Sequence, residues 1–165
     1  MAAIKWFRNS ASAVAFTLAA IVSSTSAFAD DSVNTGYFGG VAIMGYDPVA
    51  YFTEGKPVKG SEKFSYDWLG TPWHFASENH QQMFISEPDK YAPQYGGYCA
   101  PEVATTGSAT INIDPKAFKI IDGKLYLVYD PGSAAFFEDN SKELVPKAND
   151  NWPKVQATLN ADQYH

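Results

Sequence analysis

Residues 62–86, EKFSYDWLGTPWHFASENHQQMFIS, combine the patterns of a β-hairpin and a following helix. Aromatic residues stand at every second position from Phe64 to Trp68, with polar residues between them. That period is typical of a half-buried strand. Residues 70–72, Gly-Thr-Pro, predict a turn, and residues 73–76 are expected to return as a second strand.

The end of the same stretch predicts a helix. Ser77 has the side chain of a helix N-cap, and Glu78 suits the positive end of the helix dipole. We expect this helix to end near Ser86, because the residue before Pro88 is disfavoured in helical geometry.

A second hairpin is expected further along the chain. Two apolar runs, residues 118–121 and 125–129, flank Asp122-Gly123, a strong hairpin signal. Helices are expected over residues 133–140 and 149–159, the second with Pro153 in its first turn. No internal repeat is evident in the sequence. Hairpins followed by short helices predict an α+β fold of small antiparallel hairpins packed by short helices.

The N-terminus has the pattern of a secretory signal. Residues 1–29 carry Lys5 and Arg8 and no acid, followed by a short apolar core and the triplet Ala27-Phe28-Ala29. We expect cleavage after Ala29, export to the periplasm, and no transmembrane segment in the mature chain. Residues 30–165 would then form a single domain with a C-terminal helical extension.

Charge and composition exclude several classes of function. The chain has 165 residues, a net charge of −6 and 15% aromatic residues. Cleavage would leave 136 residues with a net charge of −8 and no arginine, because Arg8 is the single arginine. Such an acidic chain is not expected to bind nucleic acid, and it lacks bidentate guanidinium groups for phosphate. No hydrolase motif is present, so catalysis is left open but not favoured.

Few side chains could hold a soft metal. The candidates are Cys99, His80, His74 and Met83. His80 and Met83 share a face of the predicted helix. A thiolate with imidazole and thioether ligands suits copper, and zinc less well.

Other interpretations of these residues stay open. Cys99 is the single cysteine, which excludes a disulfide within the chain. It could be a buried apolar residue, a reactive thiol, or half of an intermolecular disulfide in a homodimer or with a protein partner. The cluster Tyr91, Tyr95 and Tyr98 indicates either an aromatic core or a candidate pocket for a small ligand.

Four segments together resemble the YHS domain family. These are residues 46–51 (YDPVAY), 73–80 (WHFASENH), 88–91 (PDKY) and 95–100 (YGGYCA). The last resembles the exported, single-domain bacterial branch, and the similarity covers roughly residues 36–130.

The resemblance implies a small β-sheet region packed by helices and a role in metal handling. The family's cysteine positions correspond to Ala50, Ala76 and His80, of which His80 can coordinate a metal. Cys99 would then supply the thiolate. The sequence therefore predicts an exported protein that binds copper, with a non-catalytic aromatic binding module or a single-thiol redox protein as alternatives.

Overall fold

The structure is a computed structural model that describes residues 32–162, with side chains described to residue 160. The predicted signal segment, residues 1–29, lies outside the described residues. The elements are η1 (Ala42–Gly45), α1 (Ala50–Thr53), β1 (Ser61–Trp68), β2 (Thr71–Phe75), α2 (Glu78–Ser86), α3 (Pro88–Tyr91), η2 (Gln94–Gly97), α4 (Ala100–Thr106), β3 (Asp114–Ile121), β4 (Lys124–Val128), α5 (Pro131–Asp139) and α6 (Ser141–Asp162).

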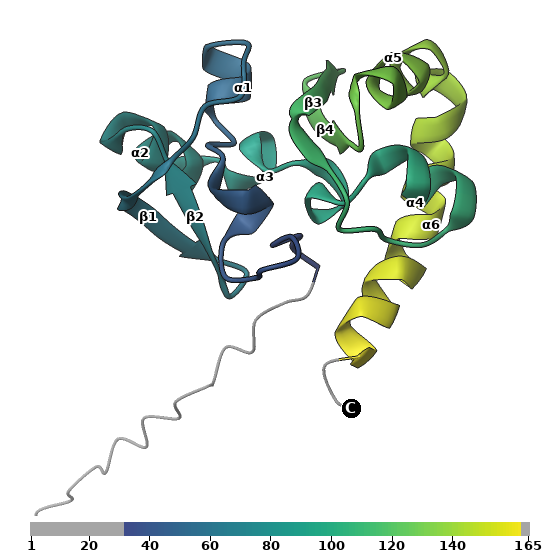
Figure 1. Cartoon of the computed structure of the whole chain (residues 1–165), viewed down its shortest axis with the longest axis horizontal. Helices are drawn as coiled ribbons and strands as arrows, with labels where there is room; N and C mark the ends of the chain where they lie inside the picture. The colour runs from purple at the N-terminus through teal and green to yellow at the C-terminus, as the bar shows by residue number, and fades with distance from the viewer. Residues whose placement is uncertain (1–31, 163–165) are drawn as a thin grey trace, which may run out of the picture.

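The fold is α+β, as predicted. Strands β1 and β2 form one two-stranded antiparallel sheet, and β3 and β4 form another. Each sheet is packed by helices, and the two hairpins lie in opposite halves of the molecule (Figure 1). Helix α2 begins after Ser77, whose side chain accepts a hydrogen bond from the backbone N–H of His80. The cap and the end of this helix at Ser86 confirm the predicted helix.

The C-terminal helix is longer than expected. The sequence predicts a start at Asn149, with Pro153 in the first turn, but α6 begins at Ser141 and contains both Pro146 and Pro153. This boundary prediction was therefore wrong. Leu144, Ala148 and Val155 are buried along the helix, so its packing outweighs the two prolines. Within the described part of the chain no helix is long and apolar enough to span a membrane.

The two halves of the chain repeat the same succession of elements. Each begins with a 3-10 turn containing left-handed residues, continues through a short helix and a hairpin, and reaches a nine-residue helix, α2 or α5. We call residues 42–93 the first repeat and residues 94–146 the second.

The registers of the hairpins support this equivalence in detail. Ser61 pairs with Phe75 in the first hairpin, and Asp114 pairs with Val128 in the second, so both partners are displaced by 53 positions. A bulge follows each of these pairs at the same place. The sequence-based expectation of no internal repeat is thus corrected by the structure. Few identities remain, such as Gly70 with Gly123, which explains why the sequence does not reveal the repeat.

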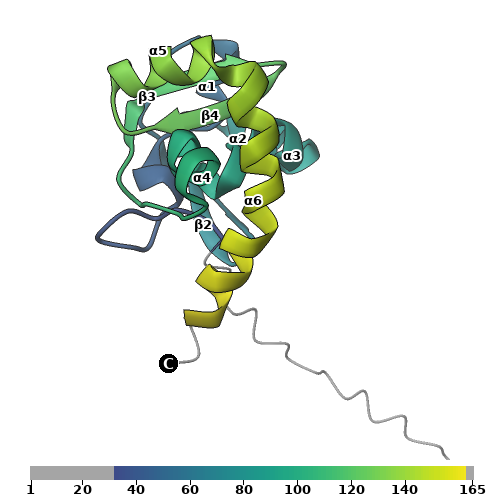
Figure 2. The same ribbon diagram turned by 90° about the vertical axis from the view of Figure 1, so that its right-hand side faces the viewer.

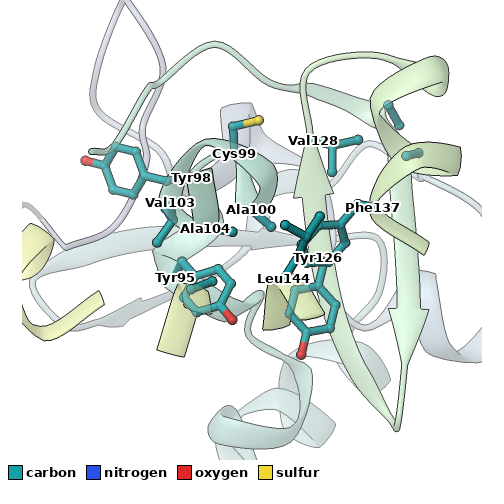
Figure 3. Packing of buried hydrophobic residues seen from close by; sticks show 13 residues of the cluster. Tyr95, Tyr98, Cys99, Ala100, Val103, Ala104, Tyr126, Val128, Phe137 and Leu144 are labelled. Atoms are coloured by element: carbon teal, nitrogen blue, oxygen red, sulfur yellow. The ribbon is translucent and has the colours of Figure 1, made fainter. Parts of the chain in front are cut away.

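Strand β4 joins the two hydrophobic cores. Leu125 and Leu127 are buried in the core that contains Trp73 and Phe84. Tyr126 and Val128 are buried in the core that contains Tyr95, Cys99 and other residues, shown in Figure 3. Because successive side chains of a strand point to opposite faces, one strand supplies both cores. The repeats therefore share a central strand.

Candidate functional site

A cleft rich in aromatic residues lies where the first repeat meets α6. It is bounded by the turn end of the first hairpin, the segment from α3 to η2, and one face of α6. Its volume is about 280 Å³. We call it the aromatic cleft, and its lining residues are Ser32, Val33, Trp68, Leu69, Trp73, Asp89, Ala92, Pro93, Gln94, Tyr95, Gly96, Asn149, Trp152, Pro153 and Gln156.

The hairpin supplies two of the tryptophans. Trp68 ends β1 and Trp73 lies on β2, on the two sides of the turn. The Trp73 indole N–H donates to the carbonyl oxygen of Trp68 at 3.2 Å. Their rings meet edge to face with centroids 5.7 Å apart, and Trp73 also stacks on Phe84. These contacts fix both indoles without a ligand.

Helix α6 supplies the opposite side of the cleft. Trp152 packs against Tyr95 and Tyr98, with ring centroids 5.8 and 6.1 Å apart. The Tyr95 hydroxyl donates to Asn149 Oδ1 at 2.9 Å. A tyrosine hydroxyl is protonated at neutral pH and can donate, and burial raises the pKa of Tyr95 further. The hydrogen bond ties η2 to α6.

Of the three tyrosines predicted as a pocket, Tyr95 lines the aromatic cleft. Tyr91 is buried and packs edge to face on Phe52, with centroids 5.5 Å apart. Tyr98 is buried in the core that contains Cys99 and Tyr126, which we call the second core, and its ring packs against Trp152. Sequence reasoning did not select Trp68, Trp73 or Trp152 as site residues. The available signal was the placement of two tryptophans on either side of one hairpin turn.

His80 and Asp47 form a buried pair in the first repeat. Asp47 is fully buried, and its Oδ2 lies 2.6 Å from His80 Nδ1. Its carboxylate also accepts hydrogen bonds from the backbone N–H groups of Val49, Ala50 and Ala76. Asp47 thus caps α1 and fixes the His80 ring, whose Nε2 lies 3.2 Å from the Thr53 hydroxyl.

The remaining histidine and methionine candidates have other neighbours. His74 lies on β2 opposite Ser65. Its ring faces Gly45, where an added Cβ would stand 3.6 Å from Nδ1. Met83 is on α2, and its sulfur accepts a hydrogen bond from the Asn79 amide at 3.5 Å.

Cys99 occupies in the second repeat the position that Asp47 occupies in the first. Both residues follow a tyrosine that ends a left-handed turn, Tyr46 or Tyr98. Burial raises the pKa of the Cys99 thiol, although the backbone N–H groups of Glu102 and Tyr129 act in the opposite direction. Those two residues correspond to Ala50 and Ala76, which donate to Asp47. The thiol therefore takes the place of the carboxylate.

The predicted metal ligands do not converge in the structure. His80 lies on α2, in the half of the molecule opposite to α4, which Cys99 precedes (Figure 1). Figure 3 shows Cys99 beside Tyr98 and Val128, among residues of the second core. Over the described residues no group of three or more His, Cys, Asp and Glu side chains could hold a metal ion. The placement of Cys99 and His80 therefore does not support the soft-metal site that the family resemblance implies, and that site stays a prediction.

The chain was compared with protein-family models, with curated proteins and with solved structures, and none of the three comparisons gives a match. The candidate site therefore rests on the geometry of this chain alone.

Proposed function

We propose that this protein is a non-catalytic binding protein that holds a small organic ligand in the aromatic cleft. The observation that carries the proposal is that three tryptophans and Tyr95, from positions as far apart as 68 and 152, line one hollow of about 280 Å³. Ligand sites are typically concave and largely apolar, with a few polar groups that fix orientation. Gln94, Asn149 and Gln156 supply polar groups here.

The distribution of tryptophan supports the same conclusion. The sequence contains four tryptophans, and three of them line the aromatic cleft. The fourth, Trp6, belongs to the segment outside the described residues. A tryptophan buried only for stability would be expected within a core, as Trp73 is. Trp68 and Trp152 instead keep part of their surface exposed at the cleft.

The family resemblance and the signal pattern support a proposal about the family of the protein and its location in the cell. We propose that the protein is an exported member of the YHS domain family that acts in the periplasm. The segments that resemble the family supply Trp73 and Tyr95, so the proposed site overlaps the similar region. Export is supported by the charge and small-residue pattern of residues 1–29.

Intrinsic tryptophan fluorescence provides the test of ligand binding. The full chain is titrated separately with choline, glucose, indole and acetate, which differ in charge and polarity. Binding in the aromatic cleft should change the emission saturably for at least one probe. Trp152→Ala should abolish that change, whereas Phe38→Ala should leave it intact, because Phe38 is a fully exposed aromatic residue outside the cleft.

Either of two results would contradict the proposal. The first is that no probe of the panel changes the emission saturably. The second is that the saturable change survives unaltered in both Trp68→Ala and Trp152→Ala, with circular dichroism showing that the variants remain folded.

Copper or zinc binding through Cys99 and His80 stays a separate prediction, without support from the placement of these residues. A ligand that binds only the folded protein, present at 100 times its Kd, should stabilise it by about 2.7 kcal/mol. Thermal unfolding with each metal would show this shift in the wild type and its loss in Cys99→Ala. An equal shift in both proteins would exclude Cys99 as a ligand.

A further inference from the structure

We infer that the ligand of the aromatic cleft is a small organic cation of the alkylammonium class. This inference rests on the proposed function, because it names the chemistry of the same site. It is carried by the charge of the lining, by the aromatic surface, and by comparison with the equivalent place in the second repeat.

The charged group of the lining is a carboxylate. Asp89 is exposed at the rim of the cleft, and no lysine or histidine is among the described lining residues. The adjacent Lys90 is directed elsewhere, since its ammonium group binds Glu87 at 2.8 Å and lies over the ring of Tyr91. Lys90 therefore does not neutralise Asp89, and the Asp89 carboxylate can face a bound cation.

The aromatic lining suits the same ligand. The face of an aromatic ring carries partial negative charge, and it attracts ammonium groups, most strongly when the ring is tryptophan. Among the aromatic residues that line the hollow, Trp68 and Trp152 keep part of their surface exposed, whereas Trp73 and Tyr95 are buried. An anion would meet these faces and Asp89 without a balancing positive group, so the lining disfavours it.

The second repeat contains an equivalent hollow that has neither aromatic lining residues nor a net negative charge. A pocket of about 270 Å³ lies at its hairpin turn, and its lining residues are Ile121, Asp122, Ser141, Lys142, Val145 and Pro146. We call it the second corner.

The displacement of 53 positions relates the two hollows residue by residue. Ile121 stands where the first repeat has Trp68, and Lys142 stands where it has Asp89. The fold therefore produces a hollow at this place in both repeats, whereas the aromatic lining is confined to the first hollow, and the second hollow contains both an acid, Asp122, and a base, Lys142. The hollow itself is thus a property of the repeated fold, whereas the side chains suited to a cation are a property of the first hollow.

Size further limits the ligand. A hollow of about 280 Å³ lies at the small end of ligand pockets, which are roughly 300–1,000 Å³. It suits a molecule of the size of choline or another short quaternary amine. Hydroxyl or carboxyl groups on such a molecule could meet Gln94 or Gln156.

Choline and its neutral isostere provide the test. In 3,3-dimethylbutan-1-ol a carbon atom replaces the nitrogen of choline, so shape is kept and charge is lost. We expect choline to bind the full chain, by calorimetry and tryptophan fluorescence, at least about tenfold more tightly than the isostere. Asp89→Asn should weaken choline binding about two- to fivefold and leave the isostere unchanged. Asp122→Asn, at the second corner, is the matched control and should change neither.

The remaining outcomes overturn the inference in distinguishable ways. If the isostere binds as tightly as choline, or if glucose or indole binds while choline does not, the cation inference fails and the binding function stands. If choline binds but Asp89→Asn and Trp68→Ala do not weaken it, the cation binds outside this cleft and the inference fails. If no probe binds, both the inference and the proposed function fail.

Discussion

Asp47 shows how one buried side chain can organise its surroundings. Its two carboxylate oxygens meet three backbone N–H groups and the His80 ring, from α1, from the end of β2 and from α2. The residue has no exposed surface. A buried carboxylate stabilises the fold only when hydrogen-bond donors surround it. If it is removed, those buried donors lose their acceptor, which is costly.

Replacement of Asp47 should therefore be severe. Asp47→Ala leaves three backbone N–H groups and the His80 ring without their acceptor, and we expect a loss of about 3–5 kcal/mol in the free energy of unfolding. Urea denaturation measures the loss. His80→Gln, which removes only one partner, should cost less. An Asp47→Ala protein within about 1 kcal/mol of wild type would contradict this account of the site.

The buried phenols and the buried thiol predict instability at alkaline pH. Burial raises the pKa of Cys99 above its ordinary value of 9.0, and raises the pKa of Tyr51 and Tyr126 above 10.0. Above these ordinary values the unfolded chain loses protons that the folded chain retains. The free energy of unfolding is then expected to fall as pH rises from about 9.

Urea denaturation at a series of pH values between neutral and strongly alkaline conditions tests this expectation. Tyr51→Phe should lose some stability at neutral pH, because the hydroxyl donates to the Pro115 carbonyl at 2.7 Å. Its stability should nevertheless decline less steeply above pH 10. If the free energy of unfolding falls with pH equally steeply in wild type and variant, Tyr51 does not contribute to the alkaline instability.

At the scale of elements, local patterns predict the hairpins and α2 well. Alternating residues, the Asp122-Gly123 turn and the Ser77 cap each act through near neighbours. The aromatic cleft could not be predicted in this way, because Trp152 and Trp73 come to line one cleft only when α6 has packed on the second repeat. The repeat was hidden for a related reason, since backbone registers and bulges are retained where side chains differ.

The turn of the first hairpin contains a strained residue. Leu69 has a φ of 53° and Gly70 a φ of 68°, and the equivalent residues Asp122 and Gly123 have φ of 51° and 73°. Asparagine and aspartate tolerate this left-handed geometry better than leucine. Leu69→Asn should therefore raise the free energy of unfolding by about 1 kcal/mol.

Thermal unfolding measures this gain, with Asp122→Asn as the control that should change little. A fall in the melting temperature of Leu69→Asn would indicate that Leu69 contributes more by packing at the cleft than it costs in backbone strain.

The equivalence of Asp47 and Cys99 can be tested by building the aspartate–histidine pair of the first repeat into the second. Ser133 stands where the first repeat has His80, three residues after the helix cap. Cys99→Asp alone should destabilise the protein, because the new carboxylate is buried without the imidazole that accompanies Asp47. The added Ser133→His should restore about 0.5–3 kcal/mol. Additive effects in a double-mutant cycle would contradict the equivalence.

For the whole molecule, the shared strand β4 connects the cores of the two repeats, and the long α6 packs on the second repeat. The aromatic cleft lies between the repeats, with walls from the first repeat and from η2 and α6. Figure 2 shows α6 running along one side of the molecule, with α4 next to it. The cleft therefore depends on both repeats being folded, and ligand binding should stabilise the whole chain.

The most direct test of the central claim is an NMR titration of the full chain that follows the indole N–H signals of Trp68, Trp73 and Trp152 as choline is added. If the aromatic cleft binds a small ligand, these three signals should shift together along one saturation curve, while the backbone signals of Ile121, Lys142 and Val145 at the second corner stay in place. If the indole signals do not move with choline, glucose, indole or acetate, or if the second corner responds equally, the account is contradicted.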